Sequence, residues 1–247
     1  AFAFMDDRYK PWYGSPMSQE QRRQAYQMLL EHRLSPAQIY TRKEPLPSKE
    51  DIPFCVEHGL NAICLNYTGG EKNEAGRAEI SATIREYEKY LRDNGWWDMA
   101  YLYGFDEPPS SKWPALRNQF GWTKEQFPDL PRACTVLPNK QLKGYVNRWI
   151  PLVANFDYEE SQEYIRDGDE VWWYICCGPG YPYANWMLEF PLIESRLIWW
   201  QAFQNDVEGF LYWGLNIWER KNNDKSIPDS AGPRLDFPGA GTLMATR

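Results

Sequence analysis

The sequence predicts an α/β protein with a (β/α)8 barrel of the TIM type. Short apolar runs alternate with helix-like stretches along nearly the whole chain, and there are eight such runs. The 247 residues also match the roughly 250 that a barrel of this type occupies. A doubly wound parallel sheet is the alternative, because strand order cannot be read from a sequence.

The eight predicted strands are short runs of aliphatic, β-branched and aromatic residues bounded by turn-forming residues. In chain order they span residues 1–5, 37–40, 62–66, 99–105, 133–137, 150–155, 171–177 and 209–213.

Between these strands, apolar residues recur every three or four positions, as on one face of a helix. The stretch 18–33 opens with Ser18 and Gln21, a pair that fits a capping box. The stretch 78–93 stops before Asn94-Gly95, which is typical of a helix end. The other predicted helices span residues 49–58, 115–127, 140–148, 159–167 and 191–206.

The end of the chain departs from the alternation. Residues 219–247 are polar, rich in Pro and Gly, and carry no helical stripe. We therefore predict a barrel domain over residues 1–218 that lacks its last helix. The segment 219–247 is expected to pack on this barrel or to trail from it.

Composition excludes several classes of function. The chain carries 27 Lys and Arg against 34 Asp and Glu, a net charge of −7, so it is a poor nucleic-acid binder. No apolar run approaches the ~18 residues that a membrane span needs. The five cysteines lack CxxC spacing, the two histidines form no metal motif, and no glycine-rich phosphate loop occurs. The sequence therefore predicts no metal site and no cofactor.

Candidate site residues follow the predicted strands, because barrel enzymes place their catalytic groups at the carboxyl ends of the strands. Asp106-Glu107-Pro108 follows the fourth strand, Asn66 ends the third, and Tyr158 lies shortly after the sixth. Carboxylates, amides and flat aromatic rings together suit a sugar, because they bind its hydroxyl groups and the apolar face of its ring.

Asp106 and Glu107 form the one adjacent acidic pair that ends a predicted strand and is followed by prolines. Glycoside hydrolysis usually employs two carboxyl groups, one of which gives a proton to the leaving oxygen. A neighbouring carboxylate helps to keep such a group protonated. The competing interpretation is a loop with a helix N-cap, where acidic residues are common.

Four motifs in the second half of the chain resemble the catalytic domain of glycoside hydrolase family 123. They are YGFDEP at 103–108, WWYICCGPGYPYANW at 172–186, PLIESRLIWWQ at 191–201 and GFLYWGLNIW at 209–218. The first half of the chain agrees with the family in organisation only. Characterised members of this family are β-N-acetylgalactosaminidases.

The resemblance implies substrate-assisted retaining catalysis, in which the 2-acetamido oxygen of the substrate attacks the anomeric carbon and no protein nucleophile is needed. It implies that Glu107 is the general acid/base and that Asp106 orients and stabilises the acetamido group. It also implies substrate contacts in the matching motifs, namely Asn185, Trp213, Asn216 and Trp218.

Two functions remain open at this point. The first is hydrolysis of terminal β-linked N-acetylgalactosamine from glycans or glycolipids, which suggests a secreted or extracellular location. The alternative is a catalytically silent barrel that binds glycans or serves as a structural extracellular component, since one fold hosts many functions. The family also has a β-sandwich before the barrel and a helix after it, so we expect that other domains of a longer chain are missing here.

Overall fold

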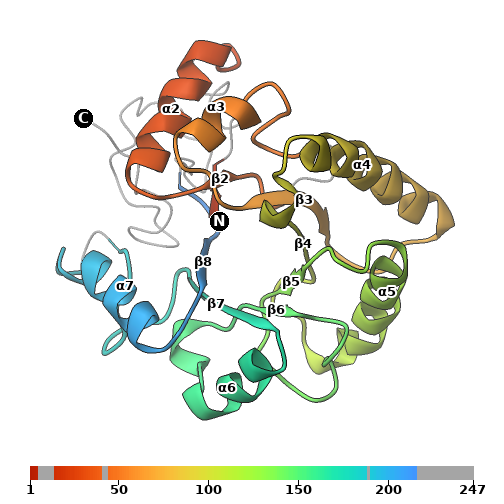
Figure 1. The fold of residues 1–247 in the computed structure, drawn as a ribbon. Helices are drawn as coiled ribbons and strands as arrows, with labels where there is room; N and C mark the ends of the chain where they lie inside the picture. The colour runs from red at the N-terminus through yellow and green to blue at the C-terminus, as the bar shows by residue number, and fades with distance from the viewer. Residues whose placement is uncertain (5–13, 41–43, 188–189, 216–247) are drawn as a thin grey trace.

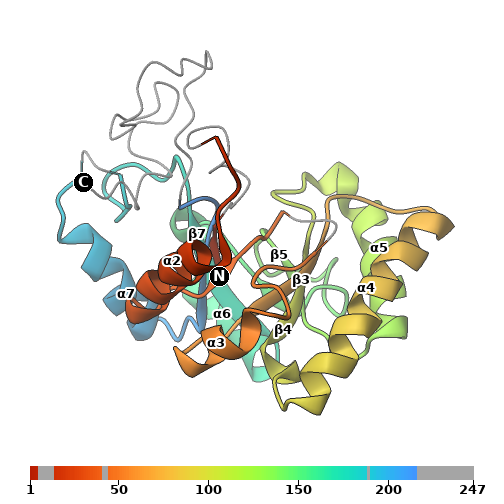
Figure 2. The same cartoon turned by 90° about the horizontal axis from the view of Figure 1, so that it is seen from above.

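The computed structural model contains eight parallel strands in a nearly closed barrel, with helices around them, which confirms the predicted (β/α)8 architecture (Figure 1; seen from above in Figure 2). The structure describes residues 1–4, 14–40, 44–187 and 190–215. The hydrogen-bonded order is β2-β1-β8-β7-β6-β5-β4-β3. The strands are β1 (Phe2–Ala3), β2 (Pro36–Ala37), β3 (Ile63–Thr68), β4 (Ala100–Gly104), β5 (Arg132–Cys134), β6 (Arg148–Trp149), β7 (Glu170–Ile175) and β8 (Gly209–Tyr212).

Six α-helices surround the strands in the part of the chain that the structure describes (Figure 1). They are α2 (Gln19–Glu31), α3 (Ile52–Glu57), α4 (Glu74–Asp93), α5 (Trp113–Gln126), α6 (Tyr158–Arg166) and α7 (Glu194–Gln204), with short 3-10 turns η2 (Trp97–Met99), η3 (Ser110–Lys112) and η4 (Val153–Asn155). Among the described residues, no helix is both long and apolar enough to cross a membrane.

The capping box predicted for α2 and the apolar stripe predicted for α4 are both present in the structure. Ser18 accepts a hydrogen bond from the Gln21 backbone, and the Gln21 side chain accepts one from the Ser18 backbone, so the capping box is present. In α4, Asn73 caps the first turn, and the predicted apolar stripe is buried against the barrel. The stripe consists of Ile80, Ile84, Tyr87 and Leu91.

The prediction was wrong between β5 and β6. Residues 140–148 do not form a helix. The Asn139 side chain accepts the Leu142 N–H at 3.1 Å, as at a helix N-cap, but Gly144 turns the chain with φ +82° before a helix extends. The Asn147 side chain then accepts the Arg132 N–H at 2.7 Å, which joins this segment to β5. The sixth strand consequently begins at Arg148, and η4 takes the end of the predicted strand 150–155.

Successive side chains of a strand point to opposite faces, so the large side chains of the strands lie in two apolar layers. Trp172 lies in the barrel interior with Tyr101, whereas its neighbour Trp173 packs in the outer layer beneath the helices. Large rings from β4 and β7 fill the interior because small side chains such as Ala3 and Ala133 face them from other strands.

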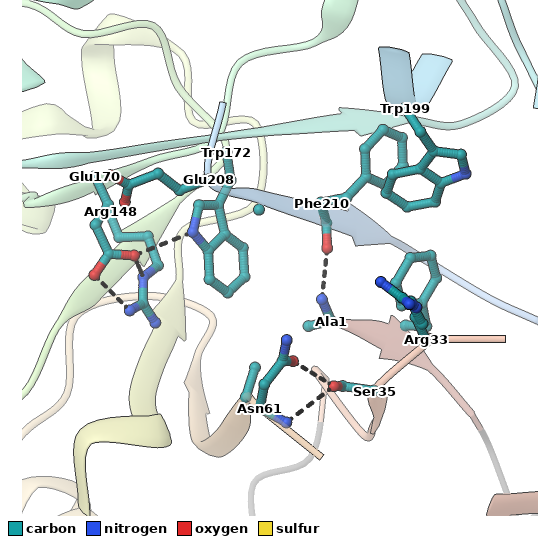
Figure 3. A pocket seen from close by; sticks show the side chains of 13 residues that line it. Ala1, Arg33, Ser35, Asn61, Arg148, Glu170, Trp172, Trp199, Glu208 and Phe210 are labelled. Atoms are coloured by element: carbon teal, nitrogen blue, oxygen red, sulfur yellow. Dashed lines mark hydrogen bonds and ion pairs between the residues drawn. The ribbon is translucent and has the colours of Figure 1, made fainter. Parts of the chain in front are cut away.

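A polar hollow of about 350 Å³ lies at the amino-terminal ends of the strands (Figure 3). Arg148 makes two hydrogen bonds of 2.8 Å to Glu170, which also accepts one from the indole of Trp172 at 3.1 Å. The Arg148 guanidinium lies over the Trp172 ring, 4.5 Å from its centroid, and over Tyr101 at 5.1 Å. These groups close one end of the barrel and pair with one another.

Candidate active site

Two adjoining hollows open at the carboxyl ends of the strands. The smaller, of about 220 Å³, is lined by Tyr40, Asp106, Glu107, Thr135, Tyr174, Cys176, Cys177, Leu211 and Trp213. The larger, of about 390 Å³, is lined by Glu107, Thr135, Val136, Leu137, Pro151, Leu152, Asn155 and Tyr174. Glu107 therefore borders both hollows, whereas Asp106 lines only the smaller one.

The two acids follow β4 on a backbone that L-residues rarely adopt. Phe105 has φ +55° and Glu107 has φ +45°, both in the left-handed region. Phe105 donates its N–H to the Thr68 carbonyl at 3.3 Å, and its own carbonyl accepts the Cys134 thiol at 3.2 Å. Such a conformation costs about 1–3 kcal/mol and persists only when its surroundings hold it, which is common at functional sites.

The hydroxyl of Thr135 ties the acidic pair to the end of β5. It accepts the backbone N–H of Glu107 at 2.6 Å and donates to Oδ1 of Asp106 at 3.0 Å. Thr135 is 5% exposed, so water competes little for these two bonds. One buried side chain thus fixes both the backbone of one acid and the carboxylate of the other.

Tyrosine hydroxyls supply the remaining contacts to the carboxylates. Tyr103 and Tyr40 donate to Asp106, and Tyr174 donates to Oε1 of Glu107. Burial and the adjacent carboxylates raise the pKa of all three phenols above the ordinary value. The three tyrosines therefore stay protonated at neutral pH and act as hydrogen-bond donors.

Both carboxylates remain open to solvent, since Asp106 and Glu107 are exposed at the mouth of the barrel. A charge is screened less when water is excluded, so a ligand that covers Asp106 would strengthen its electrostatic interactions.

A sequence comparison assigns this site to a family. The model of the glycoside hydrolase 123 catalytic domain matches residues 64–234, which include both acids. The chain belongs to glycoside hydrolase family 123. The match confirms the resemblance seen in the motifs, and it reaches past the predicted domain boundary at residue 218.

A solved structure supports the fold of this family 123 domain. A family 123 glycoside hydrolase from Clostridium perfringens, studied for glycolipid glycan hydrolysis, superposes with a TM-score of 0.67 at 12% identity. The match covers 97% of this chain and 52% of that one, so this chain spans about half the length of its structural neighbour. A β-glucuronidase from Parabacteroides merdae gives a TM-score of 0.44 at 12% identity, covering 91% and 33% of the two chains. No curated protein matches the sequence.

Among the substrate-contact residues predicted for the family 123 domain, Trp213 lines the smaller hollow and is half-buried. Asn185 is 2% exposed and points away from the hollows, since its side chain donates to the carbonyls of Cys176 and Pro179. Asn185 therefore holds the loop that follows β7. Asn216 and Trp218 lie outside the residues that the structure describes.

Two other predicted site residues lie away from both hollows. Asn66 is buried within β3, where the register with β4 shifts. Tyr158 begins α6, and its hydroxyl contacts Asp206 at 3.4 Å. Neither residue borders the hollows that contain Asp106 and Glu107.

The structure brings to the acidic pair five residues that the sequence did not indicate as site residues, namely Tyr40, Thr135, Tyr174, Cys176 and Cys177. Each lies within a predicted strand. Tyr174 could have been found, because it is two residues beyond Trp172 and so shares its inward face. Among the described residues, no group of three or more His, Cys, Asp or Glu side chains is placed to hold a metal ion.

Proposed function

We propose that this glycoside hydrolase cleaves terminal β-linked N-acetylgalactosamine from a glycan or glycolipid by substrate-assisted retaining catalysis. The observation that carries the proposal is the position of Glu107 between two hollows, with Asp106 in the smaller one alone. A glycosidase needs one space for the sugar and one for the leaving group, with its acid at the boundary.

In this arrangement the sugar occupies the smaller hollow and the leaving group the larger. Glu107 then gives a proton to the glycosidic oxygen as the bond breaks. The 2-acetamido oxygen attacks the anomeric carbon and forms a cyclic oxazolinium ion. In the second half-reaction Glu107 takes a proton from the water that opens this ring, so retention results and Glu107 returns to its starting state.

Asp106 acts on the acetamido group. Its carboxylate accepts the acetamido N–H and stabilises the positive charge that develops as the ring closes. Thr135, Tyr103 and Tyr40 hold this carboxylate from the protein side. Because these donors are already oriented, little reorganisation accompanies the development of charge.

The proposal is tested with two small molecules. A thiazoline analogue of N-acetylgalactosamine mimics the oxazolinium ion, so we expect it to bind far more tightly than the free sugar in a calorimetric titration. An aryl β-N-acetylgalactosaminide should be hydrolysed, and the same glycoside without its 2-acetamido group should not. Equal affinity for the analogue and the sugar would contradict acetamido participation. Sugar binding without any hydrolysis would instead support the catalytically silent, glycan-binding barrel.

A further inference from the structure

Two adjacent thiols stand in the wall of the smaller hollow. Cys176 and Cys177 directly follow β7 and both line that hollow, with their Sγ atoms 3.9 Å apart. Consecutive side chains in a strand point to opposite faces, so such an approach needs a turn. The turn is present, because the Cys176 N–H donates to the Gly178 carbonyl at 2.8 Å.

Hydrogen bonds from Asn185 hold the backbone that carries the two thiols. The Asn185 side chain donates to the Cys176 carbonyl at 3.3 Å and to the Pro179 carbonyl at 2.9 Å. Asn185 is itself held, because its N–H donates to Glu194 at the start of α7 at 3.1 Å. The two sulfur atoms are therefore presented to the hollow from an anchored turn.

We propose that Cys176 and Cys177 form a dithiol site for thiophilic metal and metalloid ions, and that an ion bound there blocks the sugar-sized hollow. The sulfur separation supports this assignment. Two thiolates on one tetrahedral Zn²⁺, each at ~2.3 Å, lie about 3.8 Å apart, close to the 3.9 Å observed between the Sγ atoms.

The two thiols provide only two protein ligands, which limits the kind of ion that the site can hold. The described residues place no third His, Cys, Asp or Glu side chain where a three-ligand metal cluster would form. A species that is satisfied by two sulfur ligands, such as a trivalent organoarsenical, therefore suits the site best. The third bond of arsenic then carries its organic group, which would project into the hollow beside Asp106 and Glu107.

The protonation state of the Cys176 thiol distinguishes chelation from simple alkylation. Burial raises the pKa of the Cys176 thiol to about 11, and the neighbouring Cys177 adds to the shift. The thiolate is the form that attacks an alkylating reagent, so such a reagent should react slowly with Cys176 at neutral pH. Phenylarsine oxide needs no prior thiolate. Its oxygen leaves as water with the two thiol protons while two As–S bonds form, and arsenic stays trivalent.

The test uses the full chain and phenylarsine oxide. Intact-mass spectrometry should show one adduct per chain, formed with loss of one water molecule. A dithiol such as 2,3-dimercaptopropanol should reverse the adduct, whereas 2-mercaptoethanol at equal thiol concentration should not. The half-saturating concentration should rise at least tenfold in both Cys176→Ser and Cys177→Ser. Cys55→Ser is the control, since that thiol is buried in the outer layer and should not affect the adduct.

The blocking step rests on the proposed function and has its own measurement. Titration of the thiazoline analogue into the arsenical adduct should show at least a tenfold loss of affinity, which the dithiol restores. An adduct that persists in both serine variants, or that 2-mercaptoethanol removes, would overturn the dithiol site. Unchanged analogue binding to the adduct would overturn the blocking. Because the adduct mass does not depend on turnover, a protein that fails to hydrolyse N-acetylgalactosaminides would still test the dithiol site.

Discussion

The hydroxyl of Thr135 lies 3.0 Å from Oδ1 of Asp106, to which it donates a hydrogen bond. The hydroxyl oxygen of Thr135 also accepts the backbone N–H of Glu107, at 2.6 Å. One side chain at the end of β5 thus links the two acids that follow β4. Because the Glu107 backbone is left-handed, loss of the hydrogen bond from its N–H to Thr135 would release Glu107 from an unfavourable conformation.

Thr135→Val should therefore reduce catalysis more than stability. The substitution keeps the shape of the side chain but removes both hydrogen bonds. A hydrogen bond to a charged group contributes about 1.5–3 kcal/mol, and each ~1.4 kcal/mol corresponds to tenfold in rate. We expect kcat/KM on an aryl β-N-acetylgalactosaminide to fall roughly 10- to 100-fold.

Thr135→Ser is the matched control, since it retains the hydroxyl and should recover most of the activity. Thermal unfolding of both variants separates a positioning role from a loss of fold. Equal activity in the valine and serine variants would show that the hydroxyl does not position the acids.

The two acids should respond differently to the leaving group. A good leaving group needs no proton, so Glu107→Ala should keep much of its activity on a dinitrophenyl glycoside. It should lose roughly 10²–10⁴-fold on a natural glycan, the range that acid catalysis contributes. Asp106→Asn should be impaired on both substrates, because the acetamido group must be oriented whatever the leaving group is.

Comparison of kcat/KM for these variants on the two substrates decides the roles. If Glu107→Ala loses activity equally on both and Asp106→Asn is spared on the activated substrate, the roles are reversed. Full activity in both variants would remove the end of β4 from the mechanism.

Trp213 is expected to stack on the sugar, since its ring is half-buried in the wall of the smaller hollow. Trp213→Ala should raise KM by roughly tenfold or more, as expected for the loss of about 1–2 kcal/mol of ring contact. Trp200→Ala is the control, because Trp200 is 70% exposed on α7 and lines neither hollow of the site. A lower melting temperature with unchanged KM in Trp213→Ala would mark this residue as part of the core.

Glu170→Gln should destabilise the fold without changing turnover. It leaves Arg148, whose side chain is 6% exposed, without its charged partner at the amino-terminal end of the barrel. Loss of one partner from a buried pair costs about 3–5 kcal/mol. Because the Glu170 side chain is 35% exposed, we expect the free energy of unfolding to fall by about 2 kcal/mol in urea.

The control for this measurement is Glu163→Gln. Glu163 lies 4.0 Å from Lys143 and its side chain is 54% exposed, so its loss should change stability by less than about 1 kcal/mol. The kcat/KM of Glu170→Gln should match that of the parent chain. A marked loss of activity at constant stability would show that the two ends of the barrel are coupled.

Local patterns in the sequence determined the elements of the fold and the location of the acids. Apolar residues at spacings of three and four gave the buried stripe of α4. The rule that barrel sites lie at strand carboxyl ends selected Asp106 and Glu107. Each of these inferences depends on residues close together in the chain, so no knowledge of the tertiary structure was needed.

The tertiary structure alone decided what surrounds the acids. Thr135 reaches Glu107 across 28 positions of sequence, and Tyr174 reaches it across 67. The loop after β7 turned Asn185 away from the hollows, and the end of β7 brought Cys176 and Cys177 to the wall of the smaller one. These contacts arise because β4, β5 and β7 curve around one axis and end at the same face. The distance between their side chains depends on barrel closure, and no local periodicity encodes it.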